Sequence, residues 1–158
     1  MDFDICRKLN LQAVPRIIER NGWAMNYVFA TPEFPGYSYT IGFFETLKLP
    51  EIIIFGINSR KCYSTFCRAF ALLQRSKENF PYSEKNYEIL QDNVPVIFNE
   101  VKYSVAYEYF DYCNEYYQDK TFIYPAMQLV WPDEKHFFPW EEDYNNRYKR
   151  QQPIICSR

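Results

Sequence analysis

Few side chains in this 158-residue chain could carry out acid–base chemistry. The one histidine, His136, lies three residues after Asp133, so the two could act as an acid–base pair, and Glu51 could pair with Asp133 if both lay at strand ends. The Asp-x-x-His spacing is common by chance, and no serine or cysteine stands in a nucleophile elbow. With four glycines, none in a G-x-G pair, the chain has no glycine-rich phosphate loop. The sequence therefore identifies no catalytic residue.

The cysteines show no pattern of a metal site or a disulfide framework. They are five in number, widely spread and never in a C-x-x-C pair, and the chain has one histidine to accompany them. We expect reduced thiols, mostly buried as small apolar side chains, and we expect no metal and no cofactor. The five are Cys6, Cys62, Cys67, Cys113 and Cys156.

Aromatic residues make up 20% of the chain, and some of them could line a pocket for a flat ligand. The alternative is that these rings belong to the core, as aromatic stripes more often do. The candidates for such a pocket are Trp23, Tyr39, Trp131, Phe138 and Trp140.

Charge is distributed unevenly along the chain, although the net charge is only −2. Residues 80–143 hold 4 basic against 13 acidic residues, a net charge of −9, and they contain nine of the 15 tyrosines. This balance disfavours nucleic-acid binding through a basic surface. Carboxylates combined with tyrosine rings are instead typical of surfaces that bind proteins, unless they form a solvated acidic face.

An acidic stripe is the most specific feature of this block. A helix predicted over residues 108–118 would place four carboxylates on one side, with two tyrosines beside them. We predict that these residues bind a protein partner with a basic surface; the alternative is a solvated face. The predicted partner-binding residues are Glu108, Asp111, Tyr112, Glu115, Tyr116 and Asp119.

Hydrophobic periodicity predicts the elements that position these residues. Six strands are expected over residues 23–30, 37–43, 51–57, 94–98, 101–107 and 122–131, of which 51–57 is apolar on both faces, as in a central strand. Three helical regions are expected over about 9–21, 59–75 and 108–118. The first is split at Pro15 and stopped by Asn21-Gly22, and Asn58 or Ser59 caps the second.

These elements predict an α+β fold in one compact domain over residues 1–158, with a mainly antiparallel sheet of about six strands covered by about three helices. The predicted helix over 59–75 carries basic residues on its outer face: Arg60, Lys61, Arg68 and Arg75. The longest apolar run, residues 52–57, is too short to cross a membrane, and residues 1–10 carry charges where a signal peptide needs an apolar stretch. We therefore expect a cytoplasmic protein with no membrane contact.

Two groups of segments carry a family resemblance. The first is Tyr37-Ser-Tyr-Thr-Ile-Gly-Phe43 followed by Leu49-Pro-Glu-Ile-Ile-Ile-Phe-Gly-Ile57, and the second is Gln128-Leu-Val-Trp-Pro-Asp133 followed by Phe138-Pro-Trp-Glu141. In order and spacing, over about residues 20–142, they resemble the bacterial family called domain of unknown function 4262. The resemblance implies a compact cytosolic domain with no assigned reaction. Its motif residues are Tyr39, Thr40, Gly42, Glu51, Gly56, Gln128, Trp131, Pro132, Asp133, Pro139 and Trp140.

We interpret these motif residues mainly as a signature of the fold. Gly42 and Gly56 are expected where a strand bends or where another backbone comes close. Asp133 can accept backbone N–H bonds in the turn that it starts. Where the family tends to have glycine between W-P-D and F-P-W, this chain has His136 and Phe137, so an altered turn is expected there.

Without a catalytic constellation, the acidic, tyrosine-rich surface favours an interaction protein over an enzyme. An immunity protein that neutralises a secreted bacterial toxin by binding it would have this character. The alternative is a small-ligand-binding protein or hydrolytic enzyme with an aromatic pocket near the W-P-D and F-P-W loop.

Overall fold

Five strands form one open sheet in the computed structural model, which describes residues 10–76, 79–120 and 123–158. The strand order is β1-β2-β3-β5-β4, and every neighbouring pair is antiparallel except β3 and β5, which are parallel. The strands are β1 (Ala24–Val28), β2 (Tyr37–Ile41), β3 (Glu51–Phe55), β4 (Ile97–Val101) and β5 (Ala126–Val130).

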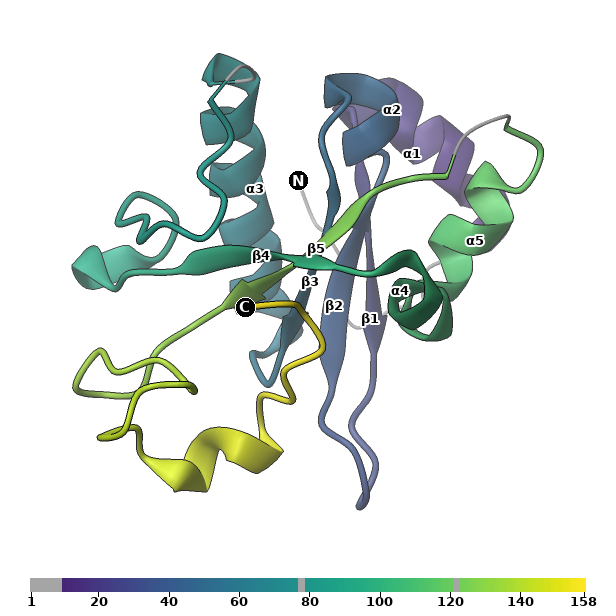
Figure 1. Cartoon of the computed structure of the whole chain (residues 1–158). Coiled ribbons are helices and arrows are strands. Elements are labelled where there is room, and N and C mark those ends of the chain that lie inside the picture. Colours follow the sequence, from purple (N-terminus) through teal and green to yellow (C-terminus); the bar gives the residue numbers. More distant parts are fainter. Residues whose placement is uncertain (1–9, 77–78, 121–122) are drawn as a thin grey trace.

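Helices cover both faces of this sheet (Figure 1). The 17-residue helix α3 lies on one side, and α1, α4 and α5 lie on the other. The α-helices are α1 (Val14–Asn21), α2 (Phe43–Leu47), α3 (Ser59–Arg75), α4 (Tyr103–Tyr109) and α5 (Asp111–Tyr117), and the 3-10 helices are η1 (Leu11–Ala13), η2 (Gln91–Asn93) and η3 (Asn146–Arg150). The α+β prediction is confirmed, with one strand fewer and two α-helices more in the described residues.

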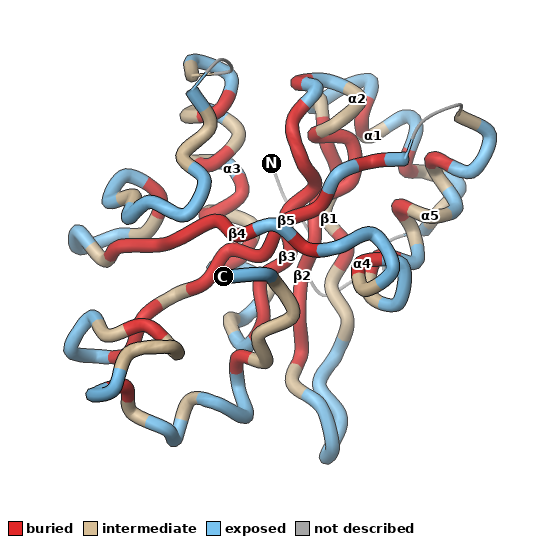
Figure 2. The backbone as a smooth tube through the Cα atoms, viewed as in Figure 1, coloured by how far each residue is buried: buried red, intermediate tan, exposed pale blue. Residues whose placement is uncertain are grey.

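The core has two main layers, one on each side of the sheet, and a smaller cluster around Phe138. The strands β2, β3, β4 and β5 are buried along most of their length, whereas the edge strand β1 is mostly half-buried (Figure 2). All five residues of β3 are buried. Ile53 and Phe55 pack in the layer of α1, α4 and α5, whereas Ile52 and Ile54 pack in the layer of α3. The prediction of a central strand covered on both faces is therefore confirmed.

Several local signals act as predicted. Gly22 ends α1 in the left-handed conformation (φ 84°), and its N–H donates to the carbonyl of Ile18 at 2.7 Å. Pro15 lies in the first turn of α1, after the separate turn η1. The side chain of Asn58 caps α3 by accepting from the N–H of Lys61 at 2.9 Å.

The prediction of a strand over residues 101–107 is wrong. The chain leaves β4 at Val101 and begins α4 at once, with the N–H groups of Val105 and Ala106 donating to the carbonyl of Lys102. The alternation of apolar and polar residues there is accidental, because Ala106 and Phe110 fill the core at helical spacing.

The prediction of one helix over residues 108–118 is also wrong. Phe110 has φ −103° and ψ 51°, which ends α4 and begins α5, so Glu108 and Glu115 lie on different helices and Asp119 follows the end of α5. Burial of the Phe110 ring against Tyr39 and Tyr124 accompanies this break.

Strand ends also differ from prediction. The strand expected over 94–98 is β4 at Ile97–Val101, and the last strand, β5, is shorter than the expected 122–131. Residue 122 lies outside the described residues.

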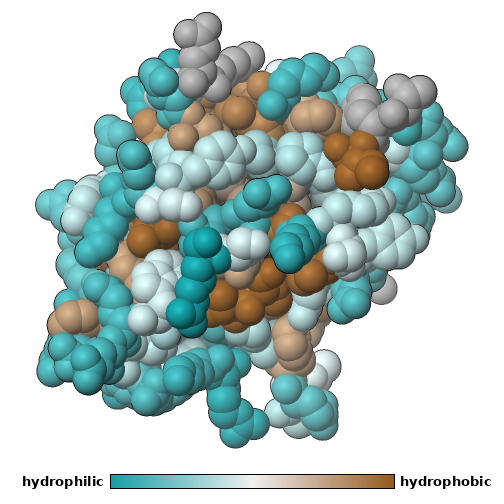
Figure 3. All heavy atoms as spheres, in the orientation of Figure 1, coloured by the Kyte–Doolittle hydropathy of each residue, from teal (hydrophilic) through white to brown (hydrophobic). Residues whose placement is uncertain are grey.

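On the face of the molecule shown in Figure 3, apolar side chains lie in several patches between hydrophilic ones.

Candidate functional site

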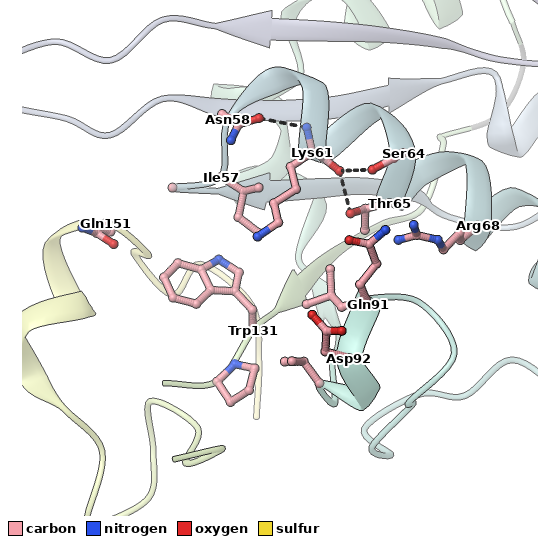
Figure 4. Close-up of a pocket in the computed structure, with 14 residues that line it drawn as sticks. Ile57, Asn58, Lys61, Ser64, Thr65, Arg68, Gln91, Asp92, Trp131 and Gln151 are labelled. Atoms are coloured by element: carbon pink, nitrogen blue, oxygen red, sulfur yellow. Dashed lines mark hydrogen bonds between the residues drawn. The ribbon is translucent and has the colours of Figure 1, made fainter. Parts of the chain in front are cut away.

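A cleft of about 390 Å³ opens where β3 and β5 end. Because these two strands are parallel neighbours, their carboxyl ends meet at one edge of the sheet, the position at which open α/β sheets bind ligands. The first turns of α3, the loop around η2, the two residues after β5 and the C-terminal segment form its walls (Figure 4). The lining residues with distinctive chemistry are Gly56, Lys61, Arg68, Asp92, Trp131 and Gln151.

Trp131 is held rigidly on one wall of the cleft. Its indole N–H donates to the carbonyl of Phe55 at 2.8 Å, and the ring of Tyr148 meets it edge-on at 5.7 Å. The Gln152 side chain accepts from the Trp131 backbone N–H and donates to its carbonyl, both at 2.8 Å. The half-buried indole thus offers a fixed aromatic surface.

The cleft is more positive than negative. Lys61 and Arg68 come from α3 and Asp92 comes from the loop opposite, and none of them forms an ion pair within the part of the chain that the structure describes. Arg68 donates one bond, at 3.3 Å, to the carbonyl of Ile89. Its other guanidinium donors remain for a ligand.

Left-handed backbone shapes the wall opposite α3. Asp92 has φ 61° and the next residue, Asn93, has φ 55°. Aspartate and asparagine tolerate this conformation better than other non-glycine residues, and consecutive residues of this kind are uncommon. The sharp turn places the Asp92 carboxylate on the cleft wall.

Gly56 is required where the C-terminal segment crosses the sheet end. It has φ 71°, and a Cβ there would lie 2.3 Å from the carbonyl oxygen of Gln151. The expectation that another backbone comes close at this glycine is therefore confirmed, and the approaching backbone belongs to a wall of the cleft.

The first family motif builds a buried carboxylate network at the other end of β3. The Glu51 carboxylate accepts from the Thr40 hydroxyl (2.6 Å), the Tyr117 hydroxyl (2.6 Å) and the backbone N–H groups of Gly42 (2.8 Å), Phe43 (3.3 Å) and Phe44 (3.1 Å). Glu51 thereby caps α2 from a distant strand, because Gly42 has no side chain to do so. Tyr39 of β2 bonds separately from this network, its hydroxyl accepting from Asn26 and from the backbone N–H of Tyr112.

Burial governs the protonation of this network. It raises the pKa of Glu51 above the ordinary value of 4.5, while four of the donors act in the opposite direction: Thr40, Tyr117, Phe44 and Gly42. Burial and the nearby Glu51 carboxyl raise the pKa of the Tyr117 hydroxyl and of the Cys113 thiol. All five hydrogen bonds to the Glu51 carboxylate come from buried or half-buried groups, so the network stabilises the fold.

The second family motif holds the C-terminal segment. Gln128 donates to the carbonyl of Pro153 at 2.8 Å and accepts from the N–H groups of Ile155 and Cys156. After β5, the Asp133 carboxylate accepts from three backbone N–H groups, those of Lys135, Phe137 and Asn145.

The rest of this motif also bonds within its own loop. The carboxylate of Glu141 accepts from the N–H of Phe138 at 2.6 Å, and Trp140, which follows Pro139, stacks on Phe138 at 5.4 Å. His136 occupies the altered turn with φ 68°, the conformation that glycine adopts most easily.

The structure separates the residues that sequence reasoning paired for acid–base chemistry. Glu51 lies opposite Ala126 at the start of β5, whereas Asp133 follows the end of β5, at least about 13 Å further along the sheet. Asp133 and the exposed His136 share a turn, but the Asp133 carboxylate is occupied by backbone donors. Burial opposes ionisation of Asp133, but these donors lower its pKa from the ordinary value of 3.8.

The five aromatic residues predicted as a pocket are not brought together. Trp23 packs with Phe43 and Tyr63 over α3, and Tyr39 is buried on the opposite face of the sheet. Phe138 and Trp140 form a separate cluster. Of the five, Trp131 alone lines the cleft, together with its neighbour Pro132.

The acidic side chains predicted to bind a partner are all exposed. These are Glu108 on α4, Asp111 and Glu115 on α5, and Asp119 in the turn that follows. Tyr112 and Tyr116 are half-buried and pack against the core, so they offer less contact area than predicted.

Sequence reasoning assigned Lys61 and Arg68 to an outer face and missed Asp92 and Gln151 as site residues. The seven-residue spacing of Lys61 and Arg68, two helical turns, was the available signal.

In the described residues Cys62, Cys67, Cys113 and Cys156 are free, and no three His, Cys, Asp or Glu side chains cluster as a metal site. Cys6 lies outside those residues. None of the described helices combines the length and apolarity needed to span a bilayer.

Comparison with known proteins gives one match. No curated protein and no solved structure matches this chain. The sequence profile described as "Domain of unknown function (DUF4262)" matches residues 17–145, slightly more than the 20–142 expected from the motifs. The match covers most of the chain and both groups of motif segments, so the chain belongs to the DUF4262 family.

Proposed function

We propose that this protein binds a small organic ligand in the cleft at the carboxyl ends of β3 and β5. The observation that carries the proposal is that Gly56, Trp131 and Pro132, which belong to the two family motifs, line one cavity together with cationic residues of α3. Its volume of about 390 Å³ lies in the range of small-molecule sites.

Binding is proposed in preference to hydrolysis. Glu51 lies at the far end of β3 and is saturated with donors, and the Asp133 carboxylate is held by backbone N–H groups. Neither of these two carboxyl groups is available in the cleft as a general acid or base, and Asp92, which does line the cleft, has no histidine beside it among the lining residues.

The experiment is a ligand-observed NMR screen of small ring compounds against the wild type and two variants. Ser64→Phe places a bulky ring in the cleft, and Ala71→Phe places the same ring on α3 at an exposed position outside it. We expect compounds that bind the wild type and Ala71→Phe but not Ser64→Phe, with similar melting temperatures for both variants. If Ser64→Phe bound the same compounds, or if no compound bound the wild type, the proposal would fail.

Protein binding through the acidic residues of α4 and α5 is the second candidate function. One observation favours it: Glu108, Asp111, Glu115 and Asp119 are exposed and form no ion pair within the described parts of the chain. A basic protein would supply the missing cations, and neutralisation of a secreted toxin by an immunity protein in the cytosol is one role of this kind.

Affinity capture from the native cell tests this second candidate, with the wild type and Asp111→Lys/Glu115→Lys as baits. Both positions are exposed, so the variant should keep its stability within about 0.5 kcal/mol. We expect a basic protein that the wild type captures at low salt and the variant does not. Equal capture by both baits would show that these carboxylates only solvate the surface.

A further inference from the structure

The two cations of the cleft lie on the same wall. Lys61 and Arg68 are seven residues apart on α3, so they lie on the same side of the helix with their backbones about 10 Å apart. Their long side chains both reach into the cleft, with the Lys61 amine directed toward the indole of Trp131 and the Arg68 guanidinium toward Gln91 (Figure 4). An anionic group between them could accept from both.

The neighbouring hydroxyl groups donate within the helix. Ser64 and Thr65 both donate to the carbonyl of Lys61, at 3.0 and 2.7 Å. The charged donors on this wall are therefore the Lys61 amine and the Arg68 guanidinium, and hydrogen bonds from charged donors to anions are the stronger kind. Arg68 is half-buried, so its attraction for an anion is screened less than that of a surface arginine.

A second wall of the cleft is aromatic. Trp131 is fixed by its bond to the Phe55 carbonyl and by the Tyr148 ring. A ligand ring that stacks on the indole would therefore lose little affinity to the ordering of this side chain. Asp92, on the remaining wall, would repel a second negative charge placed near it.

We propose that the ligand of this cleft is a planar organic anion, whose ring lies against Trp131 and whose carboxylate or phosphate lies between Lys61 and Arg68. This inference rests on the proposed function of small-ligand binding and adds the class of ligand. It assigns Lys61 and Arg68 to anion recognition and Trp131 to recognition of the ring.

The experiment compares probes that share one ring and differ in charge: 2-naphthoate, 2-naphthyl phosphate and the neutral 2-naphthamide, each titrated by calorimetry or NMR. The variants are Lys61→Gln and Arg68→Gln. Their matched controls are Arg60→Gln and Arg75→Gln, two arginines of α3 that do not line the cleft. Comparing the two anions shows whether carboxylate or phosphate is preferred.

We expect at least one anion to bind the wild type about tenfold more tightly than the amide, as a single charge-assisted hydrogen bond would give. That preference should fall about tenfold in Lys61→Gln or Arg68→Gln, remain in both control variants and weaken with added salt. Equal binding of anions and amide would overturn the ligand class while leaving small-ligand binding intact. An anion preference that survives both cleft variants, or no binding of any probe, would overturn the proposed recognition.

Discussion

Replacing Tyr117 by phenylalanine tests the interpretation of the first family motif as a structural network. The Tyr117 hydroxyl donates to the Glu51 carboxylate at 2.6 Å and accepts from the N–H of Glu45 at 3.3 Å. The ring packs in the core layer beneath α5, and a phenylalanine ring would still fill that place. Tyr117→Phe therefore removes one hydroxyl and almost no packing volume.

The expected loss depends on both hydrogen bonds of the Tyr117 hydroxyl and on its carboxyl acceptor, whose donors favour the ionised form against the effect of burial. A hydrogen bond to a charged group contributes about 1.5–3 kcal/mol to stability, whereas a bond between neutral groups contributes about 0.5–1.5 kcal/mol. Tyr124→Phe is the matched control, because its buried hydroxyl donates to the neutral Asn114 side chain at 2.5 Å in the same core layer. Tyr117→Phe should lower the free energy of unfolding by the larger amount.

Urea unfolding at pH 7, followed by tryptophan fluorescence, measures both losses, and thermal unfolding gives a second readout. For a chain of this length 1 kcal/mol corresponds to about 2–4 °C, so the melting temperature of Tyr117→Phe should fall by about 3–12 °C. A loss no larger than that of Tyr124→Phe would refute the conclusion that the Tyr117 bond to the Glu51 carboxyl group contributes more to stability than a bond between neutral groups.

Three further predictions concern the second motif and the cleft. Gly56→Ala should lower stability by about 1–2 kcal/mol through its left-handed backbone alone and should displace Gln151, so an unchanged melting temperature would contradict the close approach seen here. The lowered pKa of Asp133 means that its carboxylate stabilises the fold above pH 3.8 and that this contribution is lost as the pH falls below that value. In urea unfolding, Asp133→Asn should therefore lower the free energy of unfolding, relative to the wild type, by more at pH 7 than at pH 3. An equal loss at both pH values would refute this. Trp140→Ala should lower the free energy of unfolding by less than the loss of about 3–5 kcal/mol expected for a fully buried ring, because Trp140 is half-buried against Phe138. A stable Trp140→Ala variant that no longer binds ligand would instead place the binding site in this loop.

Sequence patterns predicted the elements whose signals are local. The strands β1 and β2, the buried strand β3 and the amphipathic helix α3 with its Asn58 cap all follow from residues close together in the chain. The alternation at residues 101–107 misled because seven residues cannot distinguish a strand from a short helix whose exposed positions happen to be aromatic. Likewise, periodicity could not predict the break at Phe110, since the ring is drawn into the core by residues far away in sequence.

The sequence by itself determined the α+β class and the family, because hydrophobic periodicity and ordered motifs are properties of the chain. Only the tertiary structure decided what the motif residues contact. Glu51 meets Tyr117 across 66 positions, and Trp131 meets Phe55 across 76. The cleft likewise depends on β3 and β5 pairing in parallel, which brings α3, Asp92 and the C-terminal segment to one edge of the sheet. Such long-range pairings leave no local periodicity, so the site emerges only when the chain is folded.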